Sequence, residues 1–251
     1  MGEGEKDRSD EGFCEHGNLP SCLWCAKVKK IQSTREYAPS PAILALKEVR
    51  PETKVLLIGD GQGSDTGQFL KMGVEAGNIS LVNYEPSEVE TANRTLNGRG
   101  VTMRQADATS IDSLYQSGIE DASQDLITLM HVLEVPDIRG DAERRLVENV
   151  ARVLRDGGEA IVSQYKKRLT PEEAKSFGVE EIRPSDLEKR FGEDWAKKFQ
   201  EQYGQPWEEG MRYSEISNIR SKEELVRLFG DVFDVTLEET GSEYVLKLKK
   251  K

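Results

Sequence analysis

The residues best suited to bind a ligand form a glycine-rich loop, Gly59-Asp60-Gly61-Gln62-Gly63, directly after an apolar run. Glycine has no Cβ, so such a loop turns sharply and lets a ligand approach its backbone closely. The G-x-G-x-G spacing differs from the G-x-G-x-x-G of dinucleotide-binding sites, because Ser64 occupies the sixth position. The loop alone predicts either a ligand site or a purely structural turn.

Two carboxylates follow the next two apolar runs. Glu85 ends the run ISLVNY, where a carboxylate can accept hydrogen bonds from both ribose hydroxyls of a nucleoside. Asp107, followed by Ala108, stands after the third run, a suitable place for an acceptor to an adenine amino group. Each acid alone is most simply a loop carboxylate. Together with the glycine loop, at three successive strand ends, they predict a nucleoside site.

A cluster of Cys14, His16, Cys22 and Cys25 near the start of the chain has the spacing C-x-H-x5-C-x2-C and holds all three cysteines. Three thiolates and an imidazole are a tetrahedral Zn²⁺ ligand set without an open position for chemistry. We therefore expect a structural zinc knuckle that caps the domain or binds a protein partner. The alternatives are cysteines gathered by chance, or an iron–sulfur site that lacks one thiolate.

Composition limits the function further. The 251 residues carry a net charge of −11, which argues against broad electrostatic binding to nucleic acid without excluding a local basic patch. We find no apolar run of the ~20 residues that span a bilayer, and no apolar core of a secretory signal near the N-terminus. We expect a cytoplasmic protein that does not enter membranes.

The elements that must position these residues alternate between strands and helices. Glycines, a Ser-x-Val-Glu start at Ser87, and the pair Gly157-Gly158 mark their ends. Two closing strands joined by Glu-Glu-Thr-Gly-Ser must be antiparallel. The predicted strands are 54–58, 79–84, 101–104, 125–130, 159–163, 232–237 and 244–248, and the predicted helices are 40–48, 65–76, 87–96, 142–155 and 222–229.

This order predicts an α/β fold with a doubly wound, mostly parallel seven-stranded sheet that ends in an antiparallel hairpin. We divide the chain into a disordered tail (1–12), a zinc knuckle and linker (13–39) and one α/β domain (40–251). Residues 166–220 interrupt the rhythm with charged and aromatic residues. They predict either a helical lid over the carboxyl edge of the sheet or a helical pair that only packs.

The motifs resemble those of class I S-adenosylmethionine-dependent methyltransferases over about residues 40–251. The matching segments are LLIGDGQG, LVNYEPS, RQADATS, DLITLMHVLEV and VLRDGGEAIVS, and the closing hairpin matches the family's reversed seventh strand. The resemblance implies a Rossmann-like sheet. It departs from the family at Leu57, where an acid usually stands two residues before the first glycine.

The resemblance also implies a cofactor, S-adenosylmethionine, and its ligands. Gly59, Gly61 and Gly63 would flank the methionine part, and Asp60 would partly substitute for the missing acid. Glu85 would hold the ribose, Asp107 with Ala108 the adenine, and His131 would contact the cofactor near the acceptor.

Methyl transfer to a sulfonium carbon needs a positioned acceptor, and a general base only when the acceptor must lose a proton. His131, at the end of the fourth predicted strand, is the best-placed general base. Alternatively, it contacts the cofactor without any proton transfer. Tyr165, Trp207 and Tyr213 either line the acceptor pocket or form the core of the insertion.

The favoured function is methyl transfer to a small molecule enclosed under the lid. The alternatives are a protein or RNA acceptor delivered by the zinc knuckle, and a module that binds S-adenosylmethionine without turnover. The Asn/Asp-Pro-Pro-aromatic motif of enzymes that methylate amino groups of nucleic acids is absent from the sequence, so base methylation is not favoured. A nucleotide-binding oxidoreductase is disfavoured by the glycine spacing and the hairpin.

Overall fold

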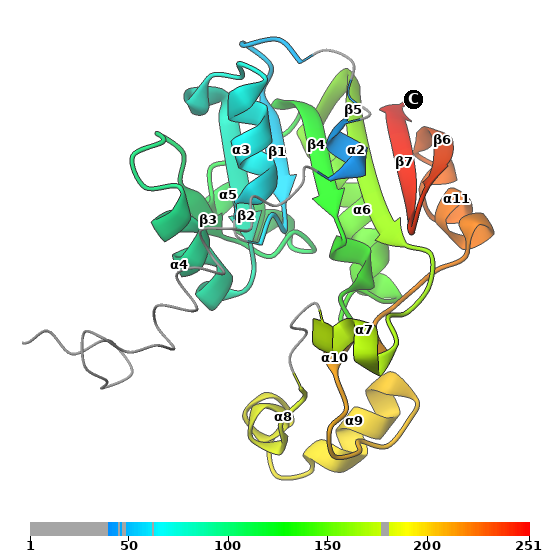
Figure 1. Cartoon of the computed structure of the whole chain (residues 1–251). Helices are drawn as coiled ribbons and strands as arrows, with labels where there is room; N and C mark the ends of the chain where they lie inside the picture. Colours follow the sequence, from blue (N-terminus) through cyan, green and yellow to red (C-terminus); the bar gives the residue numbers. More distant parts are fainter. Residues whose placement is uncertain (1–39, 45, 47–48, 62, 177–180) are drawn as a thin grey trace, which may run out of the picture. The chain divides into compact units, whose positions relative to one another are not determined.

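The computed structural model of the chain describes residues 40–44, 46, 49–61, 63–176 and 181–251 (Figure 1). The chain divides into a unit of Met1–Ala38 and a unit of Pro39–Lys251, and the described residues all belong to the second. The expected tail at 1–12 and the Cys/His cluster within 13–39 lie outside the described residues.

A seven-stranded sheet forms the centre of the second unit, with strand order β3-β2-β1-β4-β5-β7-β6. Strands β1 to β5 pair in parallel, and β7 is antiparallel to both β5 and β6. This confirms the mostly parallel sheet with a closing hairpin. The strands are β1 Val55–Ile58, β2 Ile79–Asn83, β3 Met103–Gln105, β4 Gln124–Met130, β5 Leu154–Tyr165, β6 Phe233–Thr240 and β7 Glu243–Lys250.

Helices cover both faces of the sheet, because alternate residues of the central strands point to opposite sides. In β1, Leu56 packs in one apolar cluster and Leu57 in the other. The Leu57 side is covered by α2 Pro41–Leu44, α3 Ser64–Lys71 and α4 Pro86–Thr95. The Leu56 side is covered by α5 Ile111–Gln116, α6 Asp141–Val153 and α11 Lys222–Gly230. Two short 3₁₀ helices, η1 Ala76–Asn78 and η2 Val132–Glu134, complete this part.

Three predicted boundaries are wrong for local reasons. Helix α4 starts at Pro86, and its N-cap is Glu85, not Ser87, because the Glu85 carboxylate accepts the Ser87 backbone N–H. Helix α3 stops at Lys71, and Gly73 adopts a left-handed φ of 91° just beyond it. Strand β5 already begins at Leu154, so the two glycines lie within the strand and do not stop the helix.

The described residues of the insertion between β5 and α11 form four short helices, and the last three of these pack around a separate apolar cluster that includes Phe199 and Ile182. In Figure 1 it lies beyond the ends toward which β4 and β5 point. Asp137, just after η2, accepts hydrogen bonds from Gln202 at 2.8 Å and Tyr203 at 3.3 Å and pairs with Arg190. These contacts join the insertion to the sheet domain. The helices are α7 Pro171–Ser176, α8 Pro184–Phe191, α9 Trp195–Tyr203 and α10 Tyr213–Ile216.

Among the described residues, we find no helix with both the length and the apolar character needed to cross a membrane. The cytoplasmic location stays a prediction.

Candidate functional site

The site lies where the ends of β1 and β4 meet. Strand β1 pairs with β2 on one side and β4 on the other, so the chain order reverses here, and ligands of open α/β sheets bind in the crevice at such a point. The loop after β1 and η2 after β4 are in close contact. A Cβ added to Gly59 would stand 2.7 Å from Cγ2 of Val132.

The glycines of the loop are required by its backbone. Gly59, Gly61 and Gly63 have φ values of 76°, 40° and 79°, a left-handed region that side chains disfavour. A Cβ on Gly61 would meet no described atom within 4 Å, whereas one on Gly63 would stand 3.0 Å from Leu96. The loop therefore exposes bare backbone on the Gly61 side and packs tightly against α4 on the Gly63 side.

Asp60 serves α3. Its carboxylate accepts hydrogen bonds from the backbone N–H groups of Asp65 and Thr66, both at 2.9 Å, and from the Thr66 hydroxyl at 2.5 Å. Burial raises the pKa of Asp60, and these hydrogen bonds act in the opposite direction. The carboxylate therefore binds the start of α3, and its expected role in place of the acid missing at Leu57 stays a prediction.

The predicted nucleoside ligands line the next two strand ends. Glu85 follows β2, is half-buried, and accepts a hydrogen bond from the Ser87 hydroxyl at 3.1 Å. After β3, one Asp107 oxygen accepts from the backbone N–H and the hydroxyl of Thr109, both at 2.8 Å. The neighbouring Ala108 is buried, and its carbonyl accepts from Asn149 at 2.9 Å. The structure thus brings the loop and both acids to one edge of the sheet, as the sequence predicts.

His131 stands between β4 and η2 with a left-handed φ of 59°. Its Nδ1 lies 2.7 Å from Oε1 of Glu134, and its ring stacks on Tyr165 with centroids 4.3 Å apart. Its Nε2 lies 3.6 Å from Oε1 of Glu243. Oε1 of Glu134 also accepts the Tyr165 backbone N–H at 2.6 Å, so the carboxylate is fixed while it orients the imidazole.

The pKa of His131 is raised above its ordinary value of 6.5. Burial acts most strongly and would lower the pKa. The hydrogen bond with Glu134 and the negative charges of Glu134, Glu243 and Asp65 together outweigh it. His131 therefore holds a proton more readily than a free imidazole and loses it at a higher pH.

Asp65 and Glu243 were not predicted as site residues. Asp65 is buried in the first turn of α3, where it accepts a hydrogen bond from the Ser40 backbone. Burial, followed by the charge of Asp60, raises its pKa to about 7. Glu243 is the first residue of β7, and burial raises its pKa, which the nearby His131 partly offsets. Neither stands in a sequence motif, since only the folded sheet brings them to His131.

We expect the Asp65→Asn variant to melt at a higher temperature than the wild type at pH 8. The folded-state pKa of Asp65 lies above its ordinary 3.8, so the folded chain binds the proton more tightly and stability falls as pH rises from about 4 to 7. Asparagine keeps the acceptor for Ser40 and removes this loss. Thermal unfolding from pH 5 to 8 checks it. A gap in melting temperature that does not widen with pH contradicts the assignment.

A cavity of about 240 Å³ opens beside His131. Its walls come from η2 with the following residues, from the end of β5 and from the start and end of α10. Tyr165 and Tyr213 both line it, whereas Trp207 packs edge-on against Trp195 and donates to the Ile182 carbonyl inside the insertion. The lining residues are His131, Glu134, Val135, Pro136, Tyr165, Lys167, Arg168, Leu169, Tyr213, Ser214, Ser217 and Ile219.

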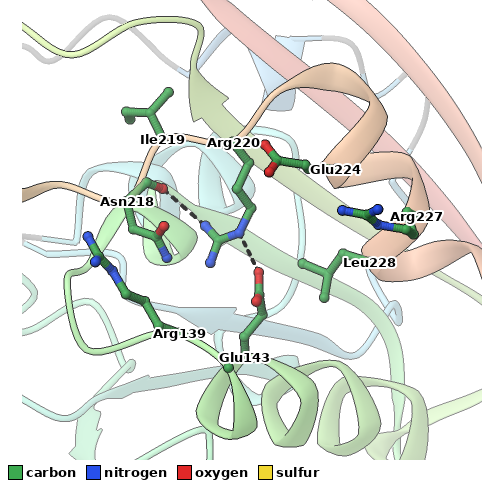
Figure 2. A pocket seen from close by; sticks show the side chains of 9 residues that line it. Arg139, Glu143, Asn218, Ile219, Arg220, Glu224, Arg227 and Leu228 are labelled. Carbon is green, nitrogen blue, oxygen red and sulfur yellow. Dashed lines mark hydrogen bonds and ion pairs between the residues drawn. The ribbon is translucent and has the colours of Figure 1, made fainter. Parts of the chain in front are cut away.

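Arg220 holds the loop that carries His131. Its guanidinium is buried and donates to the carbonyls of Leu133 at 2.6 Å and Ile138 at 2.8 Å, and it pairs with Glu143 of α6. Figure 2 shows Arg220 between Asn218 and Glu143 in a second cavity of about 360 Å³. The return segment of the insertion is thereby tied to both ends of the η2 loop.

Replacing Arg220 with methionine should lower the free energy of unfolding by about 3 kcal/mol. The change leaves a partly buried Glu143 carboxylate and the Leu133 carbonyl without their donor, and the Ile138 carbonyl keeps only its hydrogen bond from Asn218. Urea denaturation measures the loss. Arg227→Met, at an exposed position lining the same cavity, is the matched control and should change stability by less than about 0.5 kcal/mol. Similar losses in both variants argue against the role assigned to Arg220.

In the part of the chain that the structure describes, we find no group of three or more His, Cys, Asp or Glu side chains placed to hold a metal ion. The predicted zinc ligands Cys14, His16, Cys22 and Cys25 lie outside that part, so no structural support for zinc comes from the described residues.

Comparison with known proteins decides the class of the site. Residues 56–162, from β1 to β5, match the family model described as a methyltransferase domain. The chain therefore contains a methyltransferase domain. The matched residues contain the glycine loop, Glu85, Asp107 and His131.

Solved structures show that the fold of the methyltransferase is widespread. A protein from Pyrococcus horikoshii is 16% identical, with a TM-score of 0.57 and coverage of 92% of this chain and 93% of that one. An S-adenosylmethionine-dependent methyltransferase from Methanosarcina mazei is 14% identical (TM-score 0.51, coverage 80% and 94%). A possible histamine N-methyltransferase from Thermotoga maritima is 17% identical (TM-score 0.52, coverage 91% and 97%). No curated protein matches the methyltransferase.

Proposed function

We propose that this methyltransferase transfers the methyl group of S-adenosylmethionine to a small molecule held in the cavity beside His131. The observation that carries the proposal is this 240 Å³ cavity, which is lined by His131 at the end of β4, by the end of β5 and by residues of the helical insertion. A cavity of this size suits a compact ligand, and its walls combine apolar and aromatic side chains with a few polar groups.

The residues at the sheet edge fit the cofactor. Gly61 leaves open space where any other residue would place a Cβ, and Glu85 stands half-buried at the end of β2 with oxygens for a ribose. We assign Gly59, Gly61 and Gly63 to the methionine part, Glu85 to the ribose, and Asp107 with Ala108 to the adenine. When bound, the cofactor supplies a methyl group on a positively charged sulfur, which makes it an activated donor.

His131 is proposed to position the acceptor and to take its proton. Glu134 accepts a hydrogen bond from Nδ1–H of His131, so the neutral imidazole presents the lone pair of Nε2. The ring cannot rotate freely, because it stacks on Tyr165.

The insertion is proposed to act as a lid that keeps water from the acceptor. Tyr213 and Ser214 of α10 line the cavity, and Asp137 fastens α8 and α9 to the loop after η2. Water exclusion strengthens electrostatic interactions at the reacting atoms and prevents side reactions. The same contacts argue that the insertion covers the acceptor as well as packing on itself.

Transfer of a radiolabelled methyl group from S-adenosylmethionine into cell extract tests the proposal. After incubation with the purified full chain, the extract is separated into small molecules, protein and RNA. Label in the small-molecule fraction, lost with the Glu85→Gln variant, supports the proposal. Label confined to protein or RNA overturns it and makes a macromolecule the acceptor.

The zinc knuckle at Cys14, His16, Cys22 and Cys25 is also proposed, on the ligand types and spacing alone. The full chain, purified without chelator, should contain about one zinc per chain by elemental analysis, and Cys22→Ser should lose it. Zinc below about 0.2 per chain in the wild type counts against the knuckle.

A further inference from the structure

Glu243 supplies a buried carboxylate beside the acceptor cavity. Strand β7 is antiparallel to β5, so its first residue lies at the edge where the parallel strands end, opposite Tyr165. Glu243 is only 8% exposed, and Oε1 lies 3.6 Å from Nε2 of His131. Oε2 is buried without a hydrogen-bond partner among the described residues. A buried carboxylate oxygen without a hydrogen-bond partner indicates a binding position for a cationic or hydrogen-bond-donating group of a ligand.

The charges around Glu243 are mostly negative. Asp65, Glu134 and Glu243 all act electrostatically on the single imidazole of His131. The cations that line the cavity are engaged elsewhere, since Lys167 pairs with Glu173 at 3.6 Å and Arg168 donates to the Glu215 carbonyl at 2.9 Å. The carboxylates of Glu134 and Glu243 thus lie next to one imidazole, and a positively charged ligand group would compensate the excess of acids.

The wall of the cavity itself contains one polar atom that lacks a hydrogen-bond partner among the described residues. The Ser214 hydroxyl lines the cavity, its residue is 6% exposed, and Oγ is buried without a hydrogen-bond partner in the described part of the chain. Between Ser214 and His131 the walls are formed by Tyr165, Leu169 and Tyr213. The cavity thus combines apolar and aromatic walls with the unpartnered Ser214 hydroxyl, and the unpartnered Glu243 oxygen belongs to the residue next to the lining residue His131.

We propose that the methyl acceptor is a primary or secondary amine that enters as its ammonium ion and binds to Glu243 Oε2. This deepens the proposed function and rests on it, since it names the substrate class of the same cavity. An oxygen acceptor fits less well, because a phenolate or alkoxide would form beside the carboxylates of Glu134 and Glu243, where like charges repel.

The reaction balances with groups already named. The ammonium transfers one proton to Nε2 of neutral His131, and the nitrogen lone pair is released. That lone pair forms the new N–C bond while the C–S bond of the donor breaks and sulfur takes the electron pair. The products are the methylated ammonium, a neutral thioether and, once His131 releases its proton to water, one proton.

Calorimetric titration of the full chain, saturated with S-adenosylhomocysteine, tests the inference. The probes are 2-phenylethylamine, 2-phenylethanol and phenylacetate, which share a ring suited to the tyrosine-lined walls and differ in one polar group. We expect the amine to bind at least ten-fold more tightly than the alcohol, and the carboxylate to bind more weakly than either. In Glu243→Gln the amine should lose at least ten-fold in affinity. Glu238→Gln, on the neighbouring strand β6 and paired with Lys247 at 2.7 Å, should bind the amine as the wild type does.

Three results would overturn the inference: equal affinity for amine and alcohol, no binding of any probe, or an unchanged amine affinity in Glu243→Gln. A fall in S-adenosylhomocysteine affinity in Glu243→Gln would also overturn it, because the carboxylate would then serve the cofactor. The first titration, of S-adenosylhomocysteine into the wild type, tests the proposed function separately. If that ligand does not bind, the proposed function fails and the inference with it.

Discussion

The Glu85→Gln variant should bind S-adenosylmethionine about 100-fold more weakly than the wild type. Glutamine keeps the size of the side chain and one oxygen to accept from Ser87 at the start of α4. It loses the charge that strengthens hydrogen bonds to the ribose hydroxyls, and bonds to a charged partner contribute about 1.5–3 kcal/mol each. Calorimetric titration gives the two dissociation constants.

Glu90→Gln is the matched control for this experiment. Glu90 lies on the same helix, exposed, 3.8 Å from Arg94, and its replacement should leave the affinity within about two-fold of the wild type. Thermal unfolding of both variants separates a loss of binding from a loss of fold. An unchanged affinity for S-adenosylmethionine in Glu85→Gln would contradict the assignment of the ribose to the end of β2.

Replacing His131 with asparagine should lower kcat by roughly 100-fold or more while S-adenosylmethionine affinity changes little. General-base catalysis typically contributes 10²–10⁴-fold, and asparagine has no basic nitrogen. Asparagine also tolerates the left-handed backbone at this position better than most residues, so the fold should persist. Single-turnover kinetics measures the rate. A rate near that of the wild type would show that His131 contacts the bound ligands without acting as a general base.

The pH dependence provides an independent test of His131. A base acts only when it is neutral, so kcat should rise with pH through a pKa above 6.5. Glu134→Gln removes the carboxylate that raises this pKa, and the rising limb should therefore move to lower pH. If kcat rises at the same pH in the wild type and in Glu134→Gln, the group that titrates is not His131.

Local patterns in the sequence predicted the sheet and the cofactor edge. Gly59, Glu85 and Asp107 each follow an apolar run, and parallel strands end at the same edge of a sheet. This rule alone places the three residues at one edge, and the structure confirms that placement. His131 was predicted as a site residue because it ends the fourth run, whereas Glu134 was not predicted as its partner.

The acids around His131 could not be predicted in this way. Glu243 reaches the site because β7 inserts antiparallel between β5 and β6, and the pairing of Glu243 with Tyr165 is set only when the sheet forms. Asp65 looks like an ordinary first-turn acid of a helix. The hydrogen bonds of Asp60 to the start of α3 could not be predicted either, because a carboxylate that binds a helix start and one that binds a ligand have the same sequence pattern.

Native mass spectrometry of the purified full chain tests the central claim most directly. Comparison of the native with the denatured mass should reveal an excess that corresponds to S-adenosylmethionine or its demethylated product, and the excess should be absent from Glu85→Gln. An excess that corresponds to a nicotinamide or flavin nucleotide would contradict the assignment of the site to methyl transfer.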